Sequence, residues 1–496
     1  MKNKSTIILG AGFAGLSAAC FMAKAGWKVT VLEKHHQAGG RARQLKEDGF
    51  TFDMGPSWYW MPDVFERFFN QFGKKVSDYY TLKRLDPSYK IYWKDDEMDI
   101  PADLQQLKNL FESIEKGSSK QLEIFLKEAE YKYNVGINKL VFKPGQTITE
   151  FLDIEVIKGV VKLDVFTNMK KHVAKYFTNK KLQQLLEFPV LFLGALPQNI
   201  PALYSLMNYA DIVGGTWYPT NGMYSIVAAM YKLAIELGVE FKFNCDAKEI
   251  VVENGQARAL KINENDKQKT INGFDTLISS ADYHFTETKL LSKQYQSYSA
   301  KYWDSRVMAP SCLLYYVGIN KKLQKATHHT LFFDTNFEQH GKEIYDTKIF
   351  PTDPLFYVCV PSVTDQTVAP QGFENLFFLI PTASNLTNDT EEIRQKYFDL
   401  IVERYETRIG QKIKDNIVYY KSYATSNFIE DYNSFKGNAY GLANTLMQTS
   451  LLKPNCRSKK VSNLFYTGQL TVPGPGVPPS LISGEVVASL VNKLNG

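Results

Sequence analysis

The sequence has few of the features that mark disulfide scaffolds or zinc sites. Its five cysteines, Cys20, Cys245, Cys312, Cys359 and Cys456, are scattered over 496 residues, with no Cys-x-x-Cys pair and no Cys/His ligand spacing. This arrangement disfavours both structural zinc and a disulfide framework. We therefore predict no metal site, and a reducing cytoplasm is the environment that fits best.

The chain also has little excess of one charge sign over the other. The net charge is +6, and charged residues make up 22% of the chain against 44% hydrophobic residues. These values are typical of a globular protein, with a length that allows about three domains. The mild positive charge does not favour a nucleic-acid partner, although it is compatible with an anionic membrane surface. We predict no nucleic-acid binding.

No apolar run reaches the ~20 residues that a membrane-spanning helix needs. The intensely apolar stretch 188–196, FPVLFLGAL, is far shorter and carries Pro189, with Pro197 directly after it. It follows a lysine-rich segment that contains Lys170, Lys171, Lys175, Lys180 and Lys181. Two interpretations stay open: a helix that docks on a membrane surface, or a buried core segment beside a solvated lysine face.

The first 33 residues follow a strand–turn–helix–strand pattern. A strand at 6–9 ends at a glycine turn, GAGFAG (10–15), a helix extends to about residue 25, and a second strand ends at Glu33. Glycines in such a turn let the backbone approach a pyrophosphate at the helix N-terminus, and the acid at the strand end accepts from ribose hydroxyls. The dinucleotide contacts that this motif predicts are Gly10, Gly12 and Glu33.

Two further glycine-rich segments extend this site. Gly40 and Arg41 follow the ribose acid, and a planar guanidinium suits phosphate, although Arg41 could instead pair with a surface carboxylate. Near the other end, residues 468–480 (GQLTVPGPGVPPS) precede a predicted helix at 481–494. If residues 477–480 form the N-terminus of that helix, its positive end faces an electron-rich ring. The alternative is a rigid loop that only closes the domain.

The rest of the chain divides into helical and strand-rich parts. Helical patterns cover 102–140, with breaks at Gly117 and Gly136, and then 161–186 and 223–237. Strand patterns cover 239–243, a hairpin at 245–262, the segments 311–319, 330–333, 355–360 and 375–380, and finally 463–467. Because both chain ends read as strand and helix around a glycine turn, we expect one domain to use both ends.

These motifs together resemble the bacterial-type phytoene desaturases, carotenoid desaturases of the flavin amine-oxidase-like superfamily. The resemblance spans almost the full length. It rests on residues 10–15, Glu33, 39–43, 53–57, 214–222 (GGTWYPTNG), 278–282 (ISSAD), 328–332 (HHTLF), 361–372 (PSVTDQTVAPQG) and 468–484. Three departures from the family pattern are Asn221, Gln469 and Pro479.

The resemblance implies an α/β fold. A Rossmann-like FAD-binding domain would be built from both chain ends (1–92, 211–295 and 426–496), with a mixed β-sheet substrate domain (296–425) and a helical membrane-associating subdomain (93–210). FAD is the implied cofactor. The resemblance adds contacts from Phe13, Ala14 and Lys34 around the dinucleotide and from Gly55, Pro56 and Ser57 near the isoalloxazine. It also adds Ala247 near the adenine, and Gly468, Gln469, Gly476, Val477 and Pro478 over the ribityl and flavin.

The implied activity is desaturation of a long apolar carotenoid, most directly phytoene converted stepwise to lycopene, at the cytoplasmic face of a membrane. Oxygen or a quinone would take the electrons. The alternative is a later 3,4-desaturation of a hydroxylated carotene, and more distant alternatives are an amine oxidase and a non-catalytic flavin- or carotenoid-binding protein. Hydride loss to flavin needs no Ser/His/Asp or metal constellation, and no catalytic residue is identified from the sequence.

The adjacent His328 and His329 are candidates for a structural or hydrogen-bonding role. On a regular strand, neighbouring side chains point to opposite faces, so we expect the two rings to lie apart and not to share one reaction.

Overall fold

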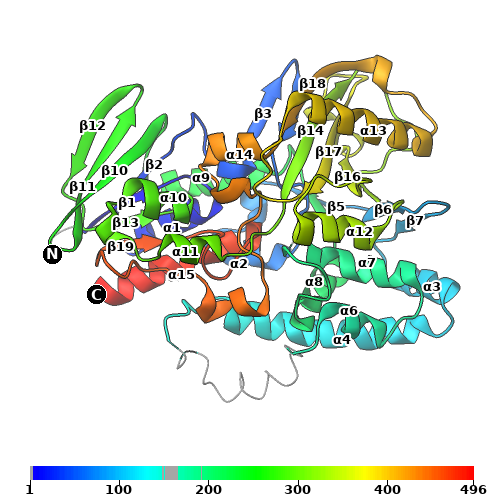
Figure 1. Ribbon diagram of the computed structural model, residues 1–496, viewed down its shortest axis with the longest axis horizontal. Helices are drawn as coiled ribbons and strands as arrows, with labels where there is room; N and C mark the ends of the chain where they lie inside the picture. Colours follow the sequence, from blue (N-terminus) through cyan, green and yellow to red (C-terminus); the bar gives the residue numbers. More distant parts are fainter. Residues whose placement is uncertain (1–3, 148–149, 151–165, 192, 496) are drawn as a thin grey trace.

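The computed structural model describes residues 4–147, 150, 166–191 and 193–495. Two main sheets organise it (Figure 1). The first is a five-stranded parallel sheet in the order β19-β13-β1-β2-β9. Its strands are β1 (Ser5–Leu9), β2 (Lys28–Leu32), β9 (Glu240–Lys242), β13 (Thr276–Ser279) and β19 (Leu464–Tyr466). The first and last strands of the chain thus lie in one sheet, and both termini lie on this side of the molecule (Figure 1).

Helices α1 (Phe13–Lys24) and α15 (Val477–Asn495) pack closely against each other beside this sheet. Small residues make the approach possible. A Cβ added to Gly484 on α15 would lie 2.4 Å from the carbonyl oxygen of Ala14 on α1. A Cβ on Gly15 would lie 2.0 Å from the carbonyl oxygen of Gly10. Larger side chains at either position would push α1 away from its partners, and with it the glycine turn that precedes α1.

The second sheet is seven-stranded, mostly antiparallel, in the order β18-β14-β17-β16-β15-β6-β7. Its strands are β6 (Tyr89–Tyr92), β7 (Glu97–Ile100), β14 (Ser311–Ile319), β15 (His329–Phe332), β16 (Phe356–Cys359), β17 (Glu374–Thr382) and β18 (Ile417–Tyr423). The predicted strands at 311–380 all lie here. β6 and β7, which flank the predicted boundary at 92/93, pair with each other in this sheet, and the domain boundaries stay predictions.

A layer of helices lies beside the second sheet at the lower right of Figure 1. It contains α3 (Leu104–Ile114), α4 (Ser118–Val135), α6 (Met169–Ala174), α7 (Lys180–Leu191) and α8 (Leu206–Asn208). The break predicted at Gly117 is present, since Gly117 has φ +86°. The helix predicted over 161–186 begins outside the described residues, and its described part forms two helices, α6 and α7. None of the described helices combines the length and apolar character that a bilayer crossing requires.

The described residues of the apolar stretch 188–196 are mostly buried, which favours the core segment over the membrane-docking helix among the two interpretations. Phe188, at the end of α7, is 2% exposed and packs against Trp58 and Trp60. Two of the preceding lysines are paired with acids, Lys170 with Glu338 and Lys181 with Asp96. Phe192 lies outside the described residues.

Smaller elements complete the fold. A three-stranded sheet contains β10 (Cys245–Glu253), β11 (Gln256–Glu264) and β12 (Lys267–Asn272), and two strand pairs join β3 (Gln44–Glu47) to β4 (Phe50–Asp53) and β5 (Leu82–Arg84) to β8 (Trp217–Pro219). The remaining α-helices are α2 (Pro62–Asn70), α9 (Tyr224–Glu236), α10 (Tyr283–Phe285), α11 (Ala300–Asp304), α12 (Phe337–Lys342), α13 (Glu391–Ile409) and α14 (Thr425–Tyr432).

Candidate cofactor and substrate site

A cavity of about 400 Å³ is lined by residues from both main sheets. All seventeen predicted cofactor residues line it, although they come from five separate segments of the chain. They are Gly10, Gly12, Phe13, Ala14, Glu33, Lys34, Gly40, Arg41, Gly55, Pro56, Ser57, Ala247, Gly468, Gln469, Gly476, Val477 and Pro478. The fold thus brings the predicted set together, and its binding role stays a prediction that the geometry below supports.

The two N-terminal glycine turns touch each other at the floor of the cavity. The backbone N–H of Gly39 donates to the carbonyl oxygen of Ala11 at 2.8 Å, and a Cβ on Gly40 would lie 3.3 Å from Gly12 Cα. Gly12 is the N-cap of α1, where no side chain caps the helix and the first turn carries no acid. The positive end of α1 therefore faces the cavity, as an anionic pyrophosphate requires.

Arg41 is a buried guanidinium with no ion pair among the described residues. It donates to Gln469 Oε1 at 3.0 Å, to Ser434 Oγ at 2.9 Å and to the carbonyl oxygen of Asn438 at 3.2 Å, all uncharged acceptors. Its Nε has no hydrogen-bond partner. Burial lowers the pKa of Arg41, because the charged form loses solvation. A cation held this way at a cavity wall fits an anionic ligand group, so the alternative of a surface ion pair for Arg41 is wrong.

Glu33 ends β2 with its carboxylate turned back on the first glycine turn. Oε2 accepts from the Ala11 backbone N–H at 2.7 Å and Oε1 from that of His35 at 2.9 Å. The residue is 5% exposed, and burial raises the pKa of its carboxyl. Each oxygen keeps a further acceptor position, so the group can hold the turn and still accept from ribose hydroxyls. Lys34 points elsewhere: its Nζ donates to the carbonyl oxygen of Glu430.

The C-terminal loop closes the cavity as a helix start. α15 begins at Val477, which confirms the predicted N-terminus at 477–480. Pro478 and Pro479 have no backbone N–H, and the N–H of Ser480 donates to the carbonyl oxygen of Gly476 at 2.9 Å. The positive end of α15 therefore offers a bound ring fewer N–H donors than the sequence analysis assumed.

Several motif residues build the scaffold around the site. Asp53 accepts from the backbone N–H groups of Met223 and Tyr224, and so caps α9. Burial raises the pKa of Asp53 to about 6. Asp365 accepts from the backbone N–H of Asn221 at 2.7 Å. Asn221 has φ +70°, a left-handed conformation that asparagine tolerates better than most other residues with a side chain.

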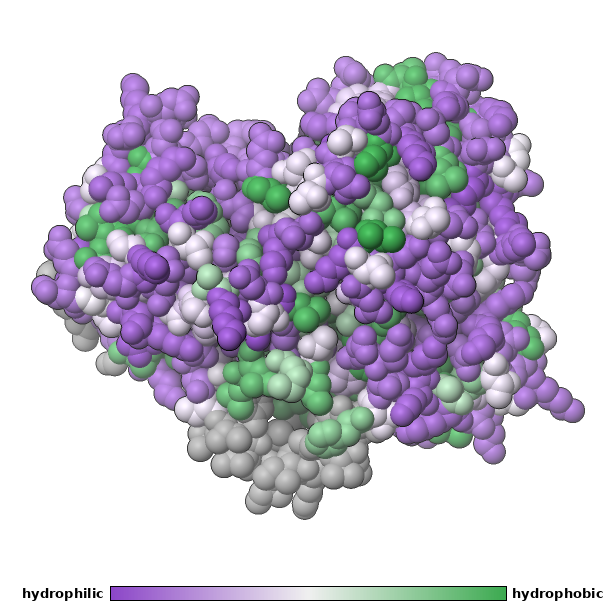
Figure 2. Space-filling view, in the orientation of Figure 1, coloured by the Kyte–Doolittle hydropathy of each residue, from purple (hydrophilic) through white to green (hydrophobic). Residues whose placement is uncertain are grey.

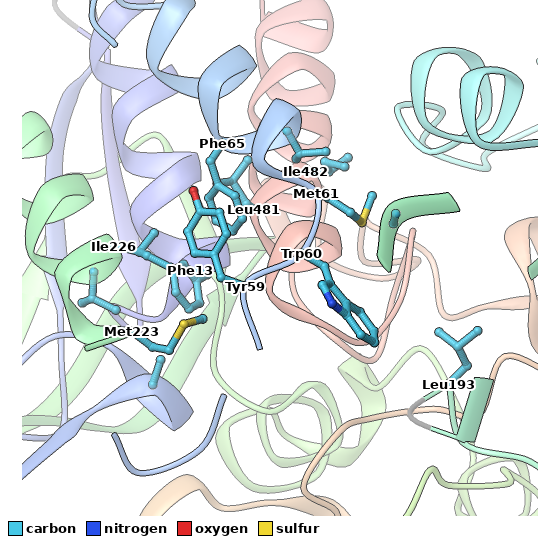
Figure 3. Close-up of a cluster of buried hydrophobic side chains, with 14 of the residues drawn as sticks. Phe13, Tyr59, Trp60, Met61, Phe65, Leu193, Met223, Ile226, Leu481 and Ile482 are labelled. Carbon is cyan, nitrogen blue, oxygen red and sulfur yellow. The ribbon is translucent and has the colours of Figure 1, made fainter. Parts of the chain in front are cut away.

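The other end of the cavity is apolar and aromatic. Its lining includes Trp58, Trp60, Met61, Leu193, Met207, Leu314 and Leu379. Figure 3 shows Trp60, Met61 and Leu193 toward one side of a buried cluster, with Phe13 and Tyr59 toward the other. Sequence reasoning missed the residues that the strands contribute to this lining. Leu314, Leu379 and Tyr357 come from three neighbouring strands and share a face through their register.

A hydrogen-bonded chain leaves this apolar end. Tyr357 lines the cavity, and its Oη lies 2.6 Å from His329 Nδ1 and 3.0 Å from Ser57 Oγ. The Trp58 indole stacks on His329 with the ring centroids 4.1 Å apart and the planes at 10°. These contacts join distant segments, so no local sequence signal could reveal them.

The expectation that His328 and His329 lie apart is wrong. Their ring centroids are 4.5 Å apart, because β15 begins at His329 and the alternation of faces does not extend to His328 before it. Both histidines and Cys359 place a possible ligand atom within 4.8 Å of one another. His329 and Cys359 are direct partners in the pairing of β15 with β16.

Comparison with known proteins identifies the family. The model of the flavin-containing amine oxidoreductases matches residues 13–492. The chain belongs to this family. It is an FAD-dependent oxidoreductase. Among curated relatives, a carotenoid 3,4-desaturase of Haloarcula japonica is 41% identical over 98% of each chain. A 4,4'-diapophytoene desaturase (4,4'-diaponeurosporene-forming) of Staphylococcus haemolyticus is 32% identical over 97% of each chain. The resemblance to carotenoid desaturases is thereby confirmed.

Solved structures agree on the fold. An oxidoreductase from Methanosarcina mazei matches with a TM-score of 0.63 at 15% identity, over 98% of this chain and 100% of that one. A redesigned putrescine oxidase matches with a TM-score of 0.61 at 11% identity, over 99% of each chain. The α/β architecture of this flavoenzyme family is therefore shown, and the described residues fit FAD: two glycine turns, an uncapped helix end and an unpaired buried arginine face one cavity.

Proposed function

We propose that this flavoenzyme is a carotenoid desaturase that introduces the 3,4 double bond of a carotenoid. The observation that carries the proposal is the shape of the cavity, which joins a polar dinucleotide end to an apolar, aromatic end. A hydrocarbon chain has no group to hydrogen-bond, so walls such as Trp60, Leu314 and Leu379 suit it by excluding water. The 41% identical relative supports a 3,4-desaturation over the phytoene reading that the motifs first suggested.

FAD would lie along the seventeen predicted residues and supply the acceptor for a hydride. The chain's own contribution is to hold and orient it. The end of α1 and Arg41 would bind the pyrophosphate, Glu33 would accept from the ribose, and Ser57 and Val477 would border the ring. The apolar end would hold the two adjacent substrate carbons near the ring, since position accounts for much of the rate when the reacting C–H bonds are not acidic.

A second candidate is desaturation of an earlier, more saturated polyene such as phytoene or a diapophytoene. The staphylococcal relative, named for such a reaction, covers 97% of this chain at 32% identity and favours it. The experiment offers purified protein and FAD three substrates in liposomes: a hydroxylated carotene, phytoene and 4,4'-diapophytoene. A product two mass units lighter from the hydroxylated carotene alone supports the proposal. Desaturation of phytoene or diapophytoene alone supports the second candidate, and no product from any of them refutes both.

A carotenoid reaches the enzyme from lipid, so we also propose that the protein associates peripherally with a membrane. Phe188 is excluded as a docking residue by its burial. Exposed apolar side chains occur instead on the turns at 446–452: Leu446 is 44%, Met447 71% and Leu452 48% exposed. Figure 2 shows apolar side chains near the lower edge of the molecule, where Figure 1 draws orange helical turns. Such side chains insert readily among acyl chains.

The docking turn has a direct test. The double variant L446S/M447S should lose cosedimentation with anionic liposomes while unfolding at the same temperature as the wild type, because both side chains are exposed. V418S, which alters a similarly exposed residue (47%) in β18, is the matched control. Unchanged cosedimentation of the double variant would rule this turn out. The electron acceptor, oxygen or a membrane quinone, stays a proposal that reoxidation of reduced enzyme with each acceptor would test.

A further inference from the structure

The carboxylates that line the cavity lie at its dinucleotide end and are all engaged. Glu33 accepts from two backbone N–H groups, and Asp282 accepts from those of Phe285 and Phe435. Asp431 pairs with Arg43, and Asp246 with Lys248. Among the described lining residues, the apolar end contains no carboxylate. A proton that leaves a substrate carbon at this end therefore needs a different acceptor.

Tyr357 and His329 form a proton path at this point. Strand pairing sets Cys359 opposite His329, and Tyr357, two residues before Cys359, projects from the same face of β16. Tyr357 lines the cavity, and its hydroxyl has two partners, His329 Nδ1 at 2.6 Å and Ser57 Oγ at 3.0 Å. The path uses the arrangement in which the phenol donates to His329 and the Ser57 hydroxyl donates to the phenol. His329 is fully buried, and its Nε2 has no hydrogen-bond partner.

The surroundings keep this pair neutral before reaction and can stabilise a charge afterwards. Burial holds the pKa of His329 well below its ordinary value, so the imidazole is unprotonated and free to accept. The facing titratable groups are also neutral: burial lowers the pKa of His328 to about 3 and raises that of Cys359 to about 12 and that of Tyr440 above its ordinary value. The stacked Trp58 face would favour an imidazolium once one forms, by a cation–π contact.

We propose that Tyr357 is the catalytic residue that takes the substrate proton, passing its own phenolic proton to His329 Nδ1. This inference rests on the proposed desaturation. In such a reaction two hydrogens leave adjacent carbons, and FAD, when bound, would supply the acceptor for the one that leaves as a hydride. The second C–H bond then breaks, its electron pair becomes the new C=C bond, and its proton binds Tyr357 Oη. The phenol O–H bond breaks as a bond to His329 Nδ1 forms, which leaves a neutral phenol and an imidazolium.

The path requires that His329 Nδ1 accept a hydrogen bond in the resting protein. The chain has seven histidines, so nitrogen NMR of ¹⁵N-histidine-labelled protein is tractable. The His329 signals are assigned as those lost in His329→Gln. We expect an unprotonated Nδ1 whose chemical shift moves in Tyr357→Phe, where the hydroxyl is gone. A protonated Nδ1, or a shift unaffected by Tyr357→Phe, overturns the inference whatever the substrate is.

The second test is anaerobic single-turnover reduction of bound FAD by the carotenoid that the wild type desaturates. Loss of a general acid–base group costs about 100-fold or more in rate, so we expect such a fall in Tyr357→Phe with unchanged FAD affinity. Incorporation of 3-fluorotyrosine at position 357 should restore the rate. Tyr405→Phe, which deletes a buried hydroxyl without a hydrogen-bond partner, is the control.

His329→Gln separates proton transfer from simple positioning. Glutamine keeps an acceptor for the phenol but cannot hold a proton, so the rate should fall about as far as in Tyr357→Phe. A rate within threefold of the wild type in either variant overturns the inference and leaves the proposed function standing. A wild-type protein whose FAD no carotenoid reduces overturns the proposed function and this inference together.

Discussion

Replacing Arg41 by methionine tests the dinucleotide end of the cavity most directly. The change keeps most of the length of the side chain and removes its charge and all its donors. In the structure these donors reach only neutral acceptors, on Gln469, Ser434 and Asn438, and Nε has none. The charge therefore has no direct ion pair among the described residues, and the nearby Asp282 carboxylate offsets the cost of burying it only in part.

The expected loss of affinity follows from the contacts available. A hydrogen bond to a charged group contributes about 1.5–3 kcal/mol. The Arg41 fork can direct at least one such bond to a phosphate, so Arg41→Met should weaken FAD binding by roughly 10- to 150-fold. Arg41→Lys keeps the charge without the planar fork, so its FAD affinity should lie between those of the wild type and Arg41→Met. Removing an unpaired buried charge should leave the free energy of unfolding of the apoprotein unchanged or slightly raised.

Titration of apoprotein with FAD, followed by quenching of flavin fluorescence, gives the dissociation constants. The matched control is Arg404→Met, since Arg404 is also largely buried but pairs with Asp334 away from the cavity. That variant should lose stability and keep its FAD affinity. An Arg41→Met protein that is folded and binds FAD within threefold of the wild type would refute the assignment of Arg41 to the pyrophosphate.

Three further predictions concern other elements. Burial lowers the pKa of Lys453 from 10.5 to about 7. Between these pH values the unfolded chain holds one more proton than the folded protein. The free energy of unfolding therefore rises with pH in this range, by about 1.4 kcal/mol per pH unit. Urea titrations at pH 7, 8 and 9 should show that Lys453→Met lacks this contribution, and parallel pH slopes would contradict it. Gly484→Ala should lower stability by about 1–3 kcal/mol or more, because its Cβ meets α1, and an unchanged urea midpoint would argue against that contact. Gly40→Ala, at φ +54°, should weaken FAD retention by pushing the two glycine turns apart, which flavin content after gel filtration measures, and wild-type content would contradict it.

The dinucleotide end could be predicted from sequence because its constraints are local. Gly10 has φ +93° and Gly12 is the N-cap of α1, so each residue type is fixed by the backbone on which it sits. The start of α15 at Val477 was readable for the same reason, from glycines and prolines before a helical pattern. The sequence did not reveal which distant residues hydrogen-bond to each other. Arg41 and Gln469 are 428 positions apart, and only the fold shows that they share a hydrogen bond.

The apolar end could not be predicted in the same way, because its lining depends on strand register. Leu379 faces the cavity since it pairs with Leu314 on one side and Tyr357 on the other. Each of these residues reads as an ordinary core residue in its own strand. Phe188 shows the converse error: an apolar run with prolines was compatible with a membrane surface, yet the ring packs against Trp58 and Trp60. Hydrophobicity alone does not separate a lipid-facing segment from a buried one.

The point at which β15 begins determines how His328 and His329 are placed, and with it the chemistry open to His329. Strict alternation would have separated His328 from His329, but β15 begins between them, and His328 turns toward the ring of its neighbour. His329 then lies sealed between Trp58 and Tyr357, with a neutral ring and a single hydrogen bond toward the cavity. An enzyme that removes a proton from a hydrocarbon cation needs a base that stays neutral and dry, because a permanent carboxylate among apolar walls is costly to bury. The Tyr357–His329 pair meets both conditions.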